Sequence, residues 1–453
     1  MAMSIRSNSR GRVRCRRAAL ITIGVLAASL AQMHGFEGPS TALRAGQTTP
    51  ASHALRRVAL YAAVGPELTL YDVDIDAATL VKRTSVTLPA SVQEAWPHPS
   101  KPLLYVAWST TGPPSAAVPR AATQAGARHG VSAFSIDPRS GALHPHGEPA
   151  SLPSRPIHMT VDKDGGHLLF AYNDPSSISV QKLERDGTIG SRVAQPTTLD
   201  GGIYAHQVRV DRSNNMVVLV TRGNGPTRNK PEDPGALKVF GYKDGVLRNR
   251  ASIAPGGGFN FQPRHLDFHP SRPWVFVTLE RQNKLQVYRS LDDGSLSAAP
   301  LFTKDTLADP GGAGRPGQAV STVHVHPNGR FVYLANRASG TTEFQGMSVF
   351  AGGENSIAVF AINEDSGEPT LIQNIDTRGF HPRTFALDSG GRILVVGNQN
   401  QVAVRESNIV RTVPAGLTVY RVRDDGRLEF ARKYDVETGG ARNLFWMGLV
   451  SLP

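Results

Sequence analysis

Short segments that are rich in apolar residues recur along the chain from about residue 58 onward, and turn residues bound each of them. Some of these segments alternate apolar and polar positions, as in RHLDF (264–268), whereas others are continuously apolar, as in WVFVTL (274–279). Gly, with 45 residues, and Pro, with 32, are frequent between them. Short runs of this kind with turn signals at close spacing predict an all-β chain.

The segments form an internal repeat. Residues 264–296 contain an alternating strand, a His-Pro turn, an apolar strand and a strand that ends in an acidic turn, and residues 323–337 with 355–371 repeat this order. Five further copies begin near Ala59, Trp96, His158, His206 and Arg383. A unit of about 40 to 50 residues is the length of a four-stranded propeller blade. We therefore predict a seven-bladed β-propeller of four-stranded antiparallel blades; two stacked β-sandwiches are the alternative, which the regular period disfavours.

The spacing of the copies adds two expectations. The central positions of the copies are Tyr61, Tyr105, Phe170, Leu219, Phe276, Tyr333 and Val395. The longer steps between them contain insertions rich in Gly and Pro (111–130, 222–236, 304–320 and 338–353), which we expect to project as loops from one face. We expect the apolar segment 443–450 to complete a blade with strands from near the N-terminus and so to close the ring.

The N-terminal segment has the features of an export signal. Six arginines and no acidic residue precede the apolar run Ala18–Ala31, which is too short to span a membrane. We predict a signal peptide at 1–31, a disordered spacer at 32–54 and a propeller domain at 55–453. The protein is then periplasmic or secreted, without stable membrane insertion. An uncleaved anchor or a mis-called start codon is the alternative, and with the latter the protein is cytoplasmic.

Charge and motifs exclude several function classes. The formal net charge is +12, of which the arginines of residues 1–31 supply half, and the rest of the chain has no dense Lys/Arg run. Nucleic acid is therefore not an expected partner. The chain has no Walker loop, no G-x-S-x-G elbow and no H-E-x-x-H helix, and its single cysteine, Cys15, lies inside the predicted signal. We expect neither a cofactor nor a metal.

Charged residues occupy equivalent positions in two copies. Glu280 and Arg337 each lie four residues after a central position, and Gly223 fills this position in the fourth copy. Both charged residues follow an apolar run that we interpret as the innermost strand of a blade, whose end points toward the central channel. Other candidates lie near the beginnings of copies, namely His206, Arg264, His265 and His324.

These residue types suit an anionic or lactone substrate. Arg264 and Arg337 can form paired hydrogen bonds to a carboxylate or phosphate, and an arginine near a carbonyl oxygen stabilises developing negative charge. Glu280 between two arginines stays ionised and can orient or deprotonate a water. His206 can protonate a leaving oxygen or polarise a carbonyl.

Plainer interpretations stay open for the same residues. Glu280 and Arg337 can form an ion pair that ties neighbouring blades, Arg264 can pair with a backbone carbonyl, and His206 can lock blades through a hydrogen bond. His265 and His324 are candidate substrate-binding residues. His98, His269 and His326, each of which stands directly before Pro in a turn, are interpreted as structural.

Several motifs resemble one known family. QPRHLDFHP (262–270), VTLE (277–280), HVHPNGRFVYLANR (324–337), NSIAVF (355–360) and HPRTFALDSGGRILVVGNQ (381–399) are similar to the seven-bladed lactonase family. That family includes bacterial 6-phosphogluconolactonase of the propeller type and fungal carboxymuconate-lactonizing enzyme. The resemblance covers roughly residues 55–450. It implies a channel site of one His, two Arg and one Glu, which match His206, Arg264, Arg337 and Glu280.

The resemblance implies a carboxylic ester hydrolase that opens a sugar lactone by water attack in the central channel. Its partner is then a small-molecule lactone or an anionic sugar acid. Two alternatives remain, a non-catalytic exported propeller that binds a ligand or a protein, and a muconate-type cycloisomerase. Since 6-phosphogluconolactone is a cytoplasmic metabolite, an exported relative would act on another sugar lactone.

Overall fold

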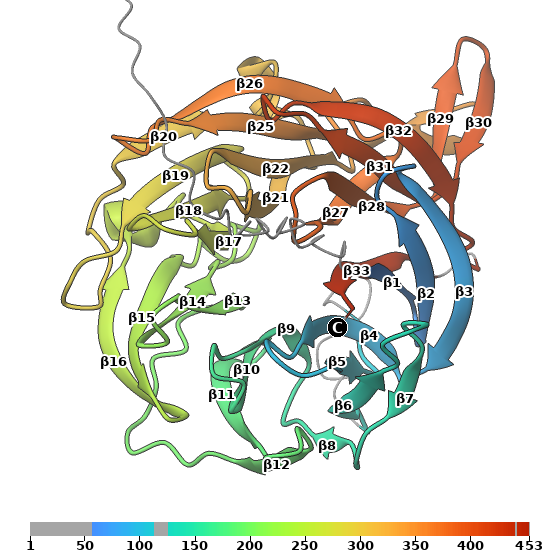
Figure 1. Cartoon of the computed structure of the whole chain (residues 1–453). Helices are drawn as coiled ribbons and strands as arrows, with labels where there is room; N and C mark the ends of the chain where they lie inside the picture. The colour runs from blue at the N-terminus through green and yellow to red at the C-terminus, as the bar shows by residue number, and fades with distance from the viewer. Residues whose placement is uncertain (1–56, 113–125, 440–441, 453) are drawn as a thin grey trace, which may run out of the picture. The chain divides into compact units, whose positions relative to one another are not determined.

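The repeated segments form β-strands that assemble into seven antiparallel sheets around a central axis (Figure 1). This computed structural model describes residues 57–112, 126–439 and 442–452. The predicted signal peptide and spacer lie outside the described residues, as does most of the insertion predicted at 111–130. In the part of the chain that is described, no helix is long and apolar enough to cross a bilayer.

Each sheet is a blade that runs outward from the axis, and the innermost strands of neighbouring blades contact one another. The innermost strands are β33 (Leu444–Ser451), β4 (Ser91–Pro97), β9 (Pro156–Val161), β13 (Ala205–Val210), β17 (Pro263–Phe268), β21 (Gln318–Val325) and β27 (Phe380–Leu387). The second strands are β1 (Val58–Val64), β5 (Leu103–Ser109), β10 (His167–Asn173), β14 (Met216–Thr221), β18 (Trp274–Leu279), β22 (Phe331–Ala338) and β28 (Ile393–Asn400).

The outer half of each blade has the same order. The third strands are β2 (Glu67–Asp74), β6 (His129–Ile136), β11 (Ser176–Leu183), β15 (Ala236–Lys243), β19 (Lys284–Arg289), β25 (Ser356–Ile362) and β31 (Gly416–Val422). The outermost are β3 (Thr79–Thr87), β7 (Leu143–Pro145), β12 (Ile189–Arg192), β16 (Val246–Ile253), β20 (Phe302–Asp305), β26 (Pro369–Asp376) and β32 (Leu428–Asp435), and a short β8 (Ala150–Ser151) pairs with β6. The predicted seven-bladed propeller is confirmed.

The ring closes in the blade that combines strands from both ends of the described chain. β33 pairs antiparallel with β1, and Tyr61 lies opposite Gly448. The expectation that 443–450 completes a blade with N-terminal strands is therefore confirmed. The C-terminal strand supplies the innermost position of this blade, and β1, β2 and β3 follow outward.

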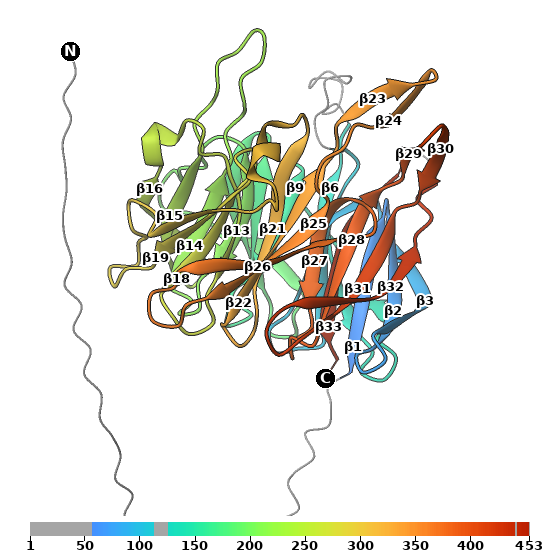
Figure 2. The same ribbon diagram turned by 90° about the horizontal axis from the view of Figure 1, so that it is seen from above.

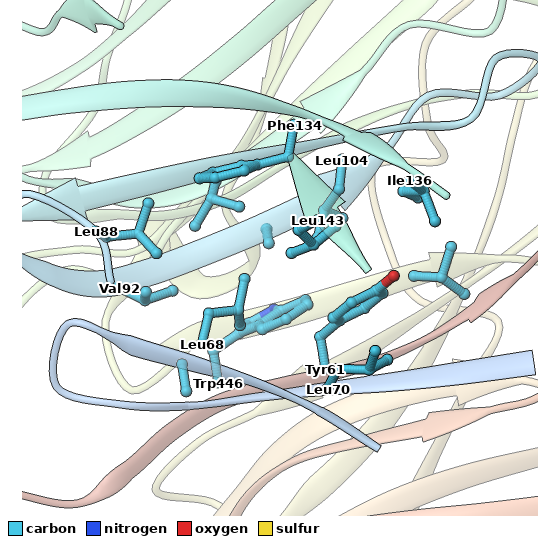
Figure 3. Close-up of a cluster of buried hydrophobic side chains, with 14 of the residues drawn as sticks. Tyr61, Leu68, Leu70, Leu88, Val92, Leu104, Phe134, Ile136, Leu143 and Trp446 are labelled. Carbon is cyan, nitrogen blue, oxygen red and sulfur yellow. The ribbon is translucent and has the colours of Figure 1, made fainter. Parts of the chain in front are cut away.

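The hydrophobic core lies between blades. Successive residues of a second strand pack against opposite neighbours: Leu60 of β1 packs toward the last blade, whereas Tyr61 packs with Leu104 and Phe134 of the next one (Figure 3). Both faces of a second strand are thus buried, which explains its continuous apolar run.

This burial corrects one expectation. The runs before Glu280 and Arg337 that we interpreted as innermost strands are the second strands β18 and β22. The innermost strands instead carry many of the polar residues, because one of their faces lines the channel.

The three histidines that we interpreted as structural, His98, His269 and His326, join neighbouring blades. Their Nδ1 atoms accept backbone N–H groups of their own turns, so Nε2 carries the proton. Each Nε2 donates to a glycine carbonyl of the next blade, in the pairs His98–Gly165 (3.1 Å), His269–Gly329 (2.8 Å) and His326–Gly391 (2.9 Å). A Cβ at Gly165, which has φ +73°, would lie 2.4 Å from the His98 ring. The turn glycine therefore allows the histidine to approach.

Insertions project from one end of the ring (Figure 2). The segment predicted as an insertion at 338–353 forms the hairpin of β23 (Thr341–Phe344) and β24 (Met347–Phe350). A second hairpin, of β29 (Val402–Glu406) and β30 (Ile409–Val413), follows β28 and was not predicted. Because both follow second strands, they mark the end of the channel at which the innermost strands begin. We call this the insertion end.

Candidate active site

Glu280 lies at the insertion end of the channel, directly after β18, and its carboxylate contacts three arginines. Its Oε2 accepts a hydrogen bond of 2.8 Å from Nη1 of Arg222. Its Oε1 contacts Nη2 of Arg337 and lies 3.1 Å from Nε of Arg264. The structure thus brings together three predicted site residues, Arg264, Glu280 and Arg337, and the ion pair between Glu280 and Arg337 does join two blades.

The arginines keep this carboxylate ionised. Burial acts to raise the pKa of Glu280, but the three guanidinium groups outweigh it and hold the pKa at about 2. Arg264, which is 1% exposed, is the most enclosed of them, and its Nε and Nη1 make no hydrogen bond in the described residues. The cluster therefore keeps donor groups that are not satisfied by protein.

Arg222 is the member of this cluster that the sequence analysis missed. Arg222 follows β14 as Glu280 follows β18, and the backbone N–H groups of the two residues donate to equivalent carbonyls, those of Tyr204 and Gln262. The repeat alignment took Leu219 as the central residue of the fourth copy, although the residue equivalent to Phe276 is Val218. The alignment therefore placed Gly223, and not Arg222, opposite Glu280. Since a shift of one residue changes the face of a strand, counting from the strand end would have identified Arg222.

Three histidines on the innermost strands of consecutive blades follow one another around the channel wall. His206 of β13 lies 5.1 Å from His265 of β17, and His265 lies 6.0 Å from His158 of β9, measured between ring centroids. The Nδ1 atom of each makes no hydrogen bond within the described residues. His206 and His265 were predicted as site residues, whereas His158 had been identified only as the start of a copy.

Burial keeps these histidines neutral. It lowers the pKa of His206 and His265 well below the usual value, and Arg264 adds to the effect. Burial followed by Arg209 does the same for the pKa of His158. A neutral imidazole can accept a proton, so the channel holds three potential proton acceptors next to the arginine cluster.

His324 does not join the Glu280 cluster. It lies further along the axis on β21, with Nδ1 3.7 Å from Oδ2 of Asp267. Asp267 also accepts a hydrogen bond of 2.7 Å from Nη2 of Arg209, and the Arg209 guanidinium lies 5.3 Å from the ring centroid of Trp96. The predicted substrate-binding residue His324 therefore belongs to a second group of polar side chains in the channel.

A cavity of about 370 Å³ lies between the histidines and the ends of the innermost strands. We call it the channel cavity. Its lining side chains include three histidines, three aromatic residues and two charged residues, namely His158, His265, His324, Trp96, Phe385, Trp446, Glu94 and Arg209. Glu280 and its arginines do not line this cavity. The channel is thus divided into an arginine-rich end and a cavity with mixed polar and aromatic walls.

Two more buried arginines lie near the insertion end. Arg383 of β27 lies with its guanidinium 3.9 Å from the ring centroid of Phe445. Arg155 donates from Nε to Oε1 of Gln93 at 2.7 Å, and its two Nη atoms make no hydrogen bond in the described residues. Burial lowers the pKa of both arginines to about 10. Unsatisfied buried guanidinium groups favour an anionic ligand at this end.

Within the described ranges, no three His, Cys, Asp or Glu side chains are grouped so that they could hold a metal ion.

Residues 98–413 match the sequence model of the family described as lactonase, 7-bladed beta-propeller. The chain belongs to this family. The match begins in the second blade and ends in the last one, so it includes every residue of the Glu280 cluster. The predicted family membership is confirmed.

Curated relatives carry one recurring name. The 6-phosphogluconolactonase of Bacillus subtilis is 28% identical over 281 residues, which cover 60% of this chain and 70% of that protein. The 6-phosphogluconolactonase of Pectobacterium carotovorum is 27% identical over 250 residues, which cover 55% of this chain and 66% of that protein. The matched stretch thus spans about two thirds of these relatives, and their names support a lactonase.

A solved structure has the same fold. The periplasmic gluconolactonase of Pseudomonas aeruginosa superposes with a TM-score of 0.62 at 18% identity, covering 88% of this chain and 100% of that one. At this identity the similarity establishes the propeller architecture alone.

Proposed function

We propose that this protein hydrolyses sugar lactones by attack of water in the central channel. The observation that carries the proposal is the arrangement on the axis, where an ionised carboxylate–arginine cluster adjoins neutral histidines. Acyl transfer to water needs a group that stabilises the oxyanion and a group that moves a proton. The arginines and the histidines supply these two functions, and the names of the curated relatives agree with the reaction class.

The arginines are proposed to bind the negative charge of the substrate or of the transition state. The Nη1 group of Arg264 makes no hydrogen bond in the described residues, although this side chain is almost completely buried. An anionic group, or a carbonyl oxygen that becomes negative, would satisfy it. Arg337 contacts the same carboxylate oxygen of Glu280 as Arg264 does, so it is proposed to contact the same ligand.

Glu280 is proposed to hold these arginines in place. Both of its oxygens contact guanidinium groups, so neither oxygen is free to take a proton from water. We therefore assign Glu280 a positioning role rather than deprotonation of water. His206, which is neutral and adjoins Arg264, is proposed to accept or donate the hydrogen bond at the reacting oxygen.

A panel of sugar lactones tests this proposal. It includes gluconolactone with and without a 6-phosphate, and proton release is followed at constant pH. We expect at least one lactone to open faster than its spontaneous rate, and Arg264→Met to lower kcat/KM about 100-fold or more. Arg423→Met, which removes an exposed arginine paired with Glu429, is the matched control and leaves the rate unchanged.

The preference within the panel identifies the substrate class. If only the lactone with a 6-phosphate is opened, the excess of buried arginines is explained by binding of that phosphate. If the two lactones are opened at equal rates, the arginines act only on the carbonyl group that reacts. If the wild-type protein opens no lactone of the panel above background, the proposed function is wrong.

A further inference from the structure

A second carboxylate, that of Glu94, faces the channel away from the Glu280 cluster. Glu94 lies on the innermost strand β4 and lines the channel cavity. Trp96, two residues further along, lines the same cavity, as expected from the alternation of side chains along a strand. Ala95 between them is buried in the core with Val92. Glu94 therefore points into the space where a small ligand fits.

The Glu94 carboxyl group makes few hydrogen bonds within the described residues. Its Oε1 accepts a hydrogen bond from Nε1 of Trp446, and the Ala95 backbone adds a second contact. The charged side chains whose fields reach it are Arg383 of β27 and Arg209 of β13. By contrast, three arginines contact Glu280 directly. The Glu94 carboxyl is thus available for contact with a ligand.

Neutral histidines share the cavity with Glu94. The Trp96 ring lies 5.7 Å from His158, and His158 lies 6.0 Å from His265, so a row of rings leads from β4 across to β17. His324 lines the cavity from β21. One space therefore presents a carboxyl group and two imidazoles whose Nδ1 atoms have no hydrogen-bond partner in the described residues.

The protonation state of Glu94 is opposite to that of Glu280. Burial raises the pKa of Glu94 to about 8, although Arg383 and the hydrogen bond from Trp446 act to lower it. The carboxyl group is therefore largely protonated near neutral pH. Two carboxylates whose surroundings move their pKa values apart mark the acid and the ionised partner in several enzymes.

We propose that Glu94 is a catalytic residue, which acts as the general acid for the leaving ring oxygen of a lactone whose ring lies in the channel cavity. The acyl group of this lactone would extend past His265, which lines the cavity, toward His206 and Arg264, since His206 lies 5.1 Å from His265. This inference rests on the proposed lactonase function and names a residue that neither the repeat nor the family resemblance assigned. The cavity volume of about 370 Å³ suits a single sugar ring. Trp96 and Phe385 provide apolar surface for the faces of that ring.

The proton movements balance. The oxygen of a water attacks the lactone carbonyl carbon, and a neutral histidine of the cavity, His265 or His158, takes the proton of that water. The bond between the acyl carbon and the ring oxygen then breaks, and the ring oxygen takes the proton of Glu94 and becomes a hydroxyl group. The imidazolium returns its proton to the Glu94 carboxylate, so one water is consumed and the side chains regain their starting states.

The test compares wild type with Glu94→Gln in the full-length protein. Gln keeps an oxygen that accepts from Trp446, so the fold is retained while the acidic proton is lost. We expect kcat for an aldonolactone to fall about 100-fold or more. We also expect the loss of activity that wild type shows as pH rises through about 8 to disappear in the variant.

A change of leaving group separates catalysis from structure. The phenolate of an aryl lactone such as dihydrocoumarin leaves without protonation, so Glu94→Gln is expected to lower its rate less than 10-fold. Glu429→Gln, which removes an exposed carboxylate of the outer strand β32, is the matched control and leaves both rates unchanged.

Two results overturn the inference alone. The first is that wild type is active and Glu94→Gln keeps a rate within about 3-fold of it, with the same pH profile. The other is an equal loss for both leaving groups, which would make Glu94 structural. An inactive wild type overturns the lactonase proposal as well, so the two failures are distinguishable.

Discussion

Two carboxylates in one channel have opposite properties because their neighbours differ. Glu280 at the insertion end contacts three arginines and has a pKa of about 2. Glu94 in the channel cavity accepts a hydrogen bond from an indole, and burial raises its pKa to about 8. Burial acts in the same direction on both groups, so the arginines account for the difference. The residue type of a channel acid therefore does not define its role.

The largest expected effect is on stability, at the arginine-rich end. Glu280→Gln leaves three enclosed guanidinium groups without a counter-charge, and removal of one partner from a buried ion pair costs about 3–5 kcal/mol. We expect the free energy of unfolding to fall by that amount, as measured by urea denaturation at pH 7. Glu429→Gln breaks an exposed pair and should cost less than about 0.5 kcal/mol. A loss below about 1 kcal/mol for Glu280→Gln would contradict the assigned role.

The pH dependence of stability should separate the two acids. Because the folded pKa of Glu94 lies above its unfolded value of about 4.5, its contribution is full below pH 4.5 and is lost as pH rises toward 8. The folded pKa of Glu280 is depressed, so its contribution is full above pH 4.5 and is lost as pH falls toward 2. Denaturation midpoints measured from pH 4 to 9 for wild type and Glu94→Gln should converge at low pH and diverge at high pH. The variant should be the more stable at pH 9, and parallel curves would exclude a raised pKa.

The smallest expected effect concerns the indole. Trp446→Phe removes the N–H that stabilises the Glu94 carboxylate, so the pKa of Glu94 should rise further. A hydrogen bond to a charged group contributes about 1.5–3 kcal/mol and one to a neutral group about 1 kcal/mol, so the difference corresponds to about one pH unit. The loss of rate at alkaline pH should therefore occur at a pH that is higher by that amount, while the pH dependence below neutral pH stays unchanged. A downward shift would show that Trp446 does not stabilise the ionised form.

The propeller could be predicted from the sequence because its repeat signals have local physical causes. His269 and His326 recur before Pro because each bonds to a turn glycine of the next blade. The apolar runs recur because second strands are buried on both faces. These requirements are the same in many blades, so they appear as a period.

The site could be predicted only in part. Arg264, Glu280 and Arg337 were found through the resemblance and the repeat, and they do meet. Arg222 was missed because an apolar centre does not define the register of a strand to one residue. Glu94 was missed because it faces the channel only if β4 is an innermost strand, whereas the apolar second strands had been interpreted as innermost. Position relative to the axis is a property of the whole ring, and no single copy encodes it.

The strand that closes the ring, β33, is synthesised long after the strands with which it forms a blade. β1, β2 and β3 are synthesised before the other strands of the ring, but the innermost strand of their blade is β33, at the other end of the described chain. At about 5–20 residues per second, the ribosome makes β33 roughly tens of seconds after β1. Until then, the edge of β1 that faces the axis has no partner and can pair with another chain. The channel, and with it any activity inside, is therefore complete only once β33 has paired with β1.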